Sequence, residues 1–297
     1  MSETATSLQR KINSAGDLQS VVRTMKALAA SNIGQYENAV RALSEYYRSV
    51  ELGLSICFRK SAPAGLKTEG ESRSTAGSVG AVVFGSDQGL VGRFNDVVAD
   101  YAIKSLAILP GDPKVWAVGE RVHARLTDAG LPPTGLFAVP NSVKAITPLV
   151  GQILVESEAR HSRGAVTELH LFHNRPTSGA VYSPISQRLL PLDESWRRNL
   201  AKLPWPTGSL PEVIGGGATT LRALIREYLF VSLFRACAES LASENASRLA
   251  AMQRADKNID ELLEDLNATF HRLRQTAIDE ELFDVTSGFE ALRPKDK

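Results

Sequence analysis

Two long stripes of apolar and small residues, one toward each end of the chain, constrain its fold more than any other feature. In the first stripe, such residues recur at alternating steps of three and four positions. They are Leu8, Ile12, Ala15, Leu18, Val22, Met25, Ala29, Ile33, Tyr36, Val40, Leu43, Tyr47, Val50 and Leu54. Because steps of this size bring side chains to one face of an α-helix, the stripe predicts a single helix of about seven heptads.

The second stripe lies in the C-terminal third of the chain and predicts a longer helix. Its members are Leu221, Leu224, Tyr228, Val231, Ala238, Leu241, Asn245, Leu249, Met252, Ala255, Ile259, Leu262, Leu266, Phe270, Leu273 and Ala277. At a rise of roughly 1.5 Å per residue, the helices would run for about 75 Å and about 100 Å, beyond the width of a small domain. We expect them to project from a globular part and to pair as an antiparallel coiled coil, slender because Ala buries little area.

Glycines interrupt the first stripe at Gly16, Gly34 and Gly53. Each costs roughly 0.5–1 kcal/mol relative to Ala in a helix interior. Because Gly16 is followed by Asp17, the sequence leaves open a local break in the helix at this point.

The segment between the stripes has a different pattern. Residues 61–78 are small and polar without periodicity, which indicates a loop. Short apolar runs then follow as GAVVF, VWAVG and ELHLF. Segments of helical length separate them at Asp96–Leu109, Arg121–Ala129 and Thr147–Arg160. Alternating strands and helices predict an α/β layer with a mostly parallel sheet.

Two further segments complete the expected organisation. Residues Pro184–Leu192 read as an edge strand or a loop, and the segment Pro204–Gly217, rich in Pro and Gly, links the α/β layer to the last helix. The predicted fold class is α/β: a long antiparallel coiled coil of the terminal helices plus an open, mostly parallel, Rossmann-like α/β domain. We place its parts at residues 1–60, 77–210 and 211–297.

Composition excludes several classes of protein. The formal net charge of the 297 residues is +1, so no basic excess points to nucleic acid or to a membrane surface. Cys57 and Cys237 lie in apolar helical patterns, which does not suggest a disulfide framework. No window approaches the roughly 20 apolar residues of a membrane span, and the first residues lack the apolar core of a signal peptide.

The glycine-rich segment Gly85–Asn95, GSDQGLVGRFN, is the feature that most resembles an enzyme. A glycine turn between a strand and a helix can bind phosphate through its backbone N–H groups. However, Gly85, Gly89 and Gly92 do not give the dinucleotide spacing, and no Gly-Lys pair completes a P-loop. The spacing favours a structural turn over a phosphate site.

The histidines and carboxylates do not indicate a catalytic or metal-binding site either. His170 and His173 would point to opposite faces of a strand, so we interpret them as ordinary sheet residues rather than metal ligands. His123, His161 and His271 are scattered along the chain. The acidic groups Glu261, Glu264 and Asp265, and Asp279, Glu280 and Glu281, fit solvated helix faces. We expect no catalytic residue, no cofactor and no metal.

Five segments carry a resemblance to a known family. They are QSVVRTMKALAAS at Gln19–Ser31, VVFGSDQGLVGRFN at Val82–Asn95, PISQRLLPL at Pro184–Leu192, ESLASENASRLAAMQRADKN at Glu239–Asn258 and RQTAIDEELFDVTSG at Arg274–Gly288. In this order they resemble the gamma subunits of F-type ATP synthases, most closely at the two ends. The resemblance implies the fold predicted above.

The resemblance also implies a function and partners. The chain would be a central rotor shaft that couples ion flow through the membrane c-ring to ATP synthesis or hydrolysis in the alpha/beta hexamer, with catalysis in the beta subunits. Its partners would be the alpha, beta and epsilon subunits and the c-ring. It would be a peripheral protein at the cytoplasmic face of a bacterial plasma membrane, without direct insertion and without nucleic acid.

Several contact residues follow from the resemblance alone. Arg274 and Gln275 would hydrogen-bond a loop of one beta subunit, and the planar guanidinium suits bidentate capture of a carboxylate. Arg248 and Glu281 would lie on contact surfaces of the C-terminal helix.

On the N-terminal helix, Arg23 and Met25 would sit near the lever of a beta subunit. The sequence departs from the family at Asn32–Gln35, where basic residues are usual, at Asp279 in place of Thr, and at Val91 in place of Cys. These changes suggest a divergent branch, such as the alternate F-type ATPases associated with sodium transport, and leave the coupling ion open.

Two other classes stay open at this point. One is an α/β enzyme with a coiled-coil arm, which requires a nucleotide or metal site within residues 79–192. The other is a passive scaffold that dimerises through its stripes.

Overall fold

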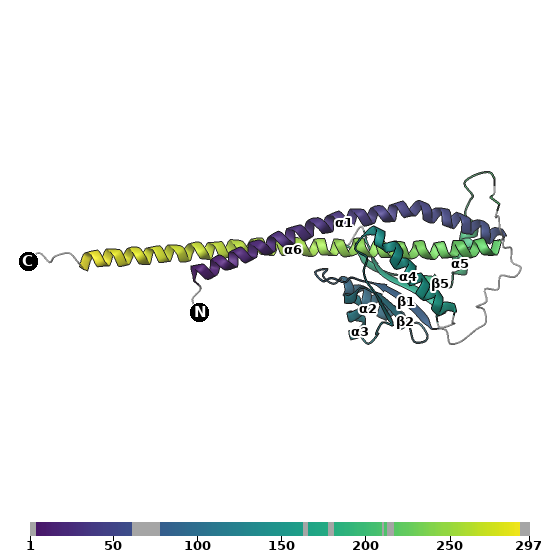
Figure 1. The fold of residues 1–297 in the computed structure, drawn as a ribbon, viewed down its shortest axis with the longest axis horizontal. Coiled ribbons are helices and arrows are strands. Elements are labelled where there is room, and N and C mark those ends of the chain that lie inside the picture. The colour runs from purple at the N-terminus through teal and green to yellow at the C-terminus, as the bar shows by residue number, and fades with distance from the viewer. Residues whose placement is uncertain are drawn as a thin grey trace, which may run out of the picture. The chain divides into compact units, whose positions relative to one another are not determined.

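The computed structural model describes residues 4–60, 78–162, 166–177, 181–209, 211–212 and 217–291 (Figure 1). The helices are α1 (Ala5–Lys60), α2 (Phe94–Leu106), α3 (Glu120–Asp128), α4 (Val143–Ser162), α5 (Glu194–Ala201) and α6 (Gly217–Ala291). The strands are β1 (Val79–Phe84), β2 (Lys114–Val118), β3 (Gly135–Phe137), β4 (Glu168–Arg175) and β5 (Ser183–Leu190). The loop expected at residues 61–78 lies outside the described residues apart from Ser78.

The two stripes form the two long helices that the sequence predicts. Helix α1 has 56 residues and α6 has 75. Helix α1 continues through Gly16 and Gly34, so the break that Gly16 could have caused does not occur. The linker was expected to extend from Pro204 to Gly217. In the structure, Gly217 is already the first residue of α6.

The chain divides into two compact units, each of which contains part of both long helices. One unit is formed by residues 1–28 and 249–297, and the other by residues 29–248. These units follow spatial packing, whereas the parts proposed from the sequence follow the ends of predicted elements. The boundaries at residues 60, 77 and 210 stay a prediction.

In the first unit, the N-terminal half of α1 packs against the C-terminal half of α6. Ala15 and Val22 of α1 form a small core with Met252 and Ile259 of α6. Leu18, although part of the same stripe, is 54% exposed, so α1 buries a narrower face than its stripe suggests. Small contact residues keep this core slender, as expected where Ala is abundant.

The second unit contains a five-stranded sheet with the order β3-β2-β1-β4-β5. Strands β1 to β4 are parallel to their neighbours, and β5 runs antiparallel to β4. The mostly parallel sheet is confirmed, and Pro184–Leu192 proves to contain an edge strand. Strand β3 was not predicted from sequence, because its three residues are too few to give a pattern.

Helices cover both faces of this sheet: α2 and α3 lie on one face and α4 on the other (Figure 1). On one face, Ala81 and Val83 of β1 pack against α2 and α3. On the other, Val82 and Phe84 pack in one core with α4 and with buried residues of α1 and α6 from the same unit. Strand β1 is therefore buried along its whole length, which is why it reads as a continuous apolar run.

We predict that Gly16→Ala stabilises the chain. An added Cβ at Gly16 would meet no atom within 4 Å, so the substitution removes only backbone freedom from the unfolded state. We expect the free energy of unfolding to rise by about 0.5–1 kcal/mol in urea titrations. At Gly53 a Cβ would approach Leu224 to 3.1 Å, so Gly53→Ala should gain less. An equal gain at both positions would contradict this account.

Candidate functional site

The glycine-rich segment after β1 folds as a structural turn in which the side chains of Ser86, Asp87 and Asn95 are hydrogen-bonded within the chain. Asp87 accepts hydrogen bonds from the backbone N–H groups of Glu120 and Val139, both at 2.9 Å. Asn95 Oδ1 accepts from the N–H of Ser86 at 3.0 Å. These contacts join β1 to the start of α3 and to the segment that follows β3, which is the structural role favoured by the glycine spacing.

An ion cluster around the buried carboxylate of Glu239 joins α6 to strand β4 in the second unit. Glu239 Oε2 accepts hydrogen bonds from His173 Nε2 at 2.9 Å and from Arg175 Nε at 2.8 Å. Its other oxygen accepts from Arg235 Nε at 2.8 Å. The side chains of His173 and Glu239 are 1% and 6% exposed, whereas those of Arg175 and Arg235 are 40% and 47% exposed, so the cluster extends from the interior of the unit to its surface.

Two serines continue this contact along the same face of α6. Ser243 Oγ donates to the carbonyl of Asn174 at 3.0 Å, and Ser247 Oγ donates to the carbonyl of Val91 at 2.6 Å. Steps of four residues keep the three α6 side chains in line. We refer to Glu239, Ser243 and Ser247, together with the groups they bind, as the polar seam.

The ion cluster sets the protonation of both of its titratable members. Burial lowers the pKa of His173, and although the Glu239 carboxylate opposes this, the net shift is downward and the ring is neutral. Burial alone would raise the pKa of Glu239, but hydrogen bonds from His173, Arg175 and Arg235 bring it down to about 2. A neutral ring that donates from Nε2 leaves Nδ1 as the acceptor, and Nδ1 has no partner among the described residues.

The two strand histidines do not converge on one another. His170 Nε2 contacts Glu168 at 3.1 Å, whereas His173 contacts Glu239. The description of His173 as an ordinary sheet residue misses its role in the seam. The sequence did contain a signal: Glu239, Ser243 and Ser247 recur at steps of four within an apolar helix. This spacing could have indicated that one polar face of the helix binds another element.

Arg248 differs from the other predicted polar contact residues because its side chain is largely buried. Its side chain is 12% exposed and donates to Glu244 Oε1 at 2.7 Å. Burial raises the pKa of Glu244, which the positive charge of Arg248 partly offsets. Both residues line a hollow of about 200 Å³ that Asn32 and Tyr36 of α1 also border.

The remaining predicted contact residues belong to the first unit. Arg23 is 59% exposed and forms ion pairs with Asp256 at 3.1 Å and Asp260 at 3.6 Å. Met25 packs at the edge of the small core between the helices. Arg274 lies eighteen residues beyond Asp256 along α6, about 27 Å at the helical rise, so these residues do not form one site.

Between Arg274 and Gly288, every residue of α6 is exposed. Arg274, Gln275 and Glu281 are exposed, and their side chains form no hydrogen bond or ion pair with any other described residue. Large apolar side chains in the same stretch are also exposed: Ile278 is 51%, Leu282 66%, Phe283 72% and Val285 69%. Ile278, Leu282 and Val285 follow the i, i+4, i+7 spacing of one helix face.

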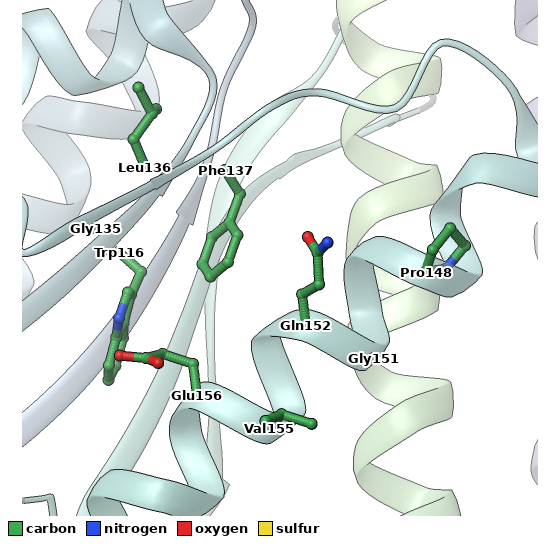
Figure 2. A pocket seen from close by; sticks show the side chains of 9 residues that line it. All are labelled: Trp116, Gly135, Leu136, Phe137, Pro148, Gly151, Gln152, Val155 and Glu156. Carbon is green, nitrogen blue, oxygen red and sulfur yellow. The ribbon is translucent and has the colours of Figure 1, made fainter.

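A hollow of the α/β part lies between strands β2 and β3 and helix α4 (Figure 2). It measures about 700 Å³ and is bordered by Trp116, Phe137, Pro148 and Val155, with Gln152 and Glu156 as its polar side chains. A single carboxylate beside apolar groups does not make a catalytic constellation. Within the described residues, no cluster of His, Cys, Asp and Glu could hold a metal, and no helix is long and apolar enough to cross a membrane.

Long terminal helices that pack against each other, an α/β layer that packs on both of them and an exposed stretch of helix define a class: a stalk protein with a globular α/β part. The family model described as ATP synthase matches residues 4–292. The gamma chain of ATP synthase from Sorangium cellulosum is 27% identical over 97% of this chain and 98% of its own length. That from Clavibacter sepedonicus is 29% identical over 95% and 96%.

Solved structures agree on the fold. A chain of the Euglena gracilis mitochondrial ATP synthase, in a structure of OSCP, F1 and c-ring in rotational state 3, superposes with a TM-score of 0.64. It is 16% identical, covering 99% of this chain and 98% of that one. A rotor chain of the same enzyme in rotational state 1 gives 0.60 at 15% identity, covering 92% and 98%.

The chain belongs to the family of ATP synthase gamma chains. It is a non-catalytic subunit of an F-type ATP synthase and forms its central stalk. This removes the α/β enzyme from the alternatives. Packing of α1 against α6 within one chain also disfavours a scaffold that dimerises through its stripes.

We predict that acid weakens the fold through the ion cluster. The pKa of Glu239 is depressed in the folded state, so its stabilising contribution is full above its unfolded value and is lost as the pH falls toward about 2. The pKa of His173 is lowered too, so below its unfolded value the unfolded state takes up a proton that the folded state does not. Both effects make stability fall with falling pH.

The measurement is urea unfolding of the parent chain and of Glu239→Gln between about pH 7 and about pH 3. We expect the variant to be less stable near neutral pH and the difference to shrink in acid. Glu261→Gln, at an exposed position of the same helix, should cost little at any pH. A difference between parent and Glu239→Gln that stays constant with pH would contradict the assigned protonation states.

Proposed function

We propose that the chain is the rotating shaft between the membrane c-ring and the catalytic alpha/beta hexamer. Ion flow through the c-ring turns the chain, and its asymmetric surface changes the nucleotide affinity of the beta subunits in turn. The epsilon subunit is a further partner. The observation that carries this proposal is the exposed end of α6, from Arg274 to Gly288.

An exposed apolar helix end needs a partner. Burial of a large apolar side chain contributes about 1.5–3 kcal/mol, so Leu282, Phe283 and Val285 represent a considerable unused driving force for association. The same stretch carries Arg274, Gln275 and Glu281. A helix with apolar and polar groups on all sides suits a partner that surrounds it, as a ring of subunits does.

The individual contacts are part of the same proposal. Arg274 and Gln275 bind a loop of one beta subunit, where the planar guanidinium captures a carboxylate. Glu281 makes a polar contact further along α6. Arg23 and Met25 approach the lever of a beta subunit, with Arg23 already held by Asp256. Arg248, which is mostly buried, can contribute only through its remaining exposed edge.

The proposed location is the cytoplasmic face of a bacterial plasma membrane, where the chain is held peripherally by the c-ring. The bacterial sources of the similar gamma chains support this assignment. The coupling ion, proton or sodium, is chosen in the c-ring. The departures at Asn32–Gln35 and Asp279 are compatible with the divergent, sodium-associated branch, whose assignment needs the sequence of the partner ring.

We predict that Arg274→Ala with Gln275→Ala weakens catalysis by the hexamer. The double variant removes charge-assisted hydrogen bonds, each of which contributes about 1.5–3 kcal/mol. If about 1.5 kcal/mol of this acts in the rate-limiting state, ATP hydrolysis falls about tenfold. The measurement is the ATPase rate of the alpha/beta hexamer purified together with a single copy of the chain.

The matched control is Arg272→Ala with Gln253→Ala, which removes the same side-chain types from exposed positions of the same helix. We expect its ATPase rate to equal that of the parent complex. Equal rates for parent and Arg274→Ala/Gln275→Ala would contradict the proposed contact. Failure of the chain to co-purify with the hexamer would contradict the proposed function as a whole.

A further inference from the structure

Helix α6 is held to the α/β sheet by directional bonds along the polar seam. Three side chains of α6 bind three consecutive residues of β4 and the turn after β1: Glu239 binds His173 and Arg175, Ser243 binds Asn174, and Ser247 binds Val91. All of them belong to the second unit. The sheet and α6 are therefore joined at several successive points rather than at one.

We propose that the polar seam is the connection through which rotary force passes between the α/β sheet and α6. This inference rests on the proposed function of the chain as a shaft. It assigns to Glu239, Ser243 and Ser247 a positioning role, which is to keep α6 from sliding or turning against the sheet while the partners apply force at its two ends.

The chemistry of the seam suits this role better than apolar packing would. Apolar contacts are non-directional, so a helix can slip along them at little cost, whereas a hydrogen bond weakens steeply as its geometry changes. Small residues around the seam, Ala238 and Ala242, are 0% and 2% exposed. They let α6 approach the sheet closely enough for short serine hydroxyls to reach backbone carbonyls.

The energetics of burying Glu239 also favour a positioning role over a stabilising one. A buried carboxylate contributes little net stability compared with apolar groups of the same volume, because its charge must be desolvated before its ion pairs can form. Glu239 is 6% exposed and bonded to three cationic or ring donors, an arrangement that fixes the position of α6. Asn174 extends the seam into α2, because its Nδ2 donates to the carbonyl of Phe94 at 2.9 Å.

The test compares two activities of one set of variants: Glu239→Gln, and Ser243→Ala with Ser247→Ala. The first activity is ATP hydrolysis by the chain with the alpha/beta hexamer alone. The second is transport of the coupling ion per ATP hydrolysed by the whole synthase in sealed vesicles. The matched control is Ser55→Ala with Ser240→Ala, at buried serines whose hydroxyls have no partner among the described residues.

We expect both seam variants to hydrolyse ATP in the subcomplex at the parent rate and to show a several-fold loss of ion transport per ATP in vesicles. The control should match the parent in both. Unchanged transport per ATP in the seam variants would overturn the inference. So would a parallel loss of hydrolysis in the subcomplex, since it would mark a general structural defect. A parent synthase that hydrolyses ATP without transport would instead contradict the proposed function.

Discussion

The burial of one α1 residue in every seven is the constraint on which the other features of the structure depend. Leu8, Ala15, Val22, Ala29, Tyr36, Val50 and Cys57 are buried and occupy equivalent positions of a heptad repeat, and Leu43, at the remaining position, is partly buried. A seven-residue period keeps one face of a helix against a partner helix over a long distance. The rest of α1 is then free to stay polar, and α6 is free to use its other faces for the α/β sheet.

The parts of the fold that the sequence predicted are those with a strong period or a long apolar run. Helices α1 and α6, the buried strand β1 and the parallel order of the sheet follow from such patterns. Strand β3 and helix α5 were not expected, because each is short and is fixed by its place beside larger elements. Within the stripes, periodicity could not separate buried Val22 from exposed Leu18.

The polar interior was harder to anticipate for a physical reason. Glu239 reads as one acidic residue among several on a long helix, and its buried state depends on His173 and Arg175, more than sixty positions earlier in the chain. The same holds for Arg248, whose ion pair with Glu244 can be guessed from a spacing of four, but whose low exposure cannot. The resemblance supplied the contact residues of the exposed helix end, which periodicity alone would not single out.

Together these features fit a non-catalytic subunit that serves as a mechanical element. In the first unit, small residues keep the core between the two helices slender. In the second unit, the polar seam joins α6 to the sheet. The stretch of α6 from Arg274 to Gly288 exposes apolar and charged groups. Arg274 and Phe283 lie at different angles around the helix, so this stretch of α6 presents different groups on its different sides.

The central claim is that the α/β part turns with the shaft. Because Cys57 and Cys237 are buried, Lys104→Cys on the exposed side of α2 gives a single accessible thiol for a probe. With the alpha/beta hexamer fixed to a surface, the account predicts stepwise rotation of the probe in one direction when ATP is added. Hydrolysis of ATP by the assembled complex while the probe stays still would contradict it.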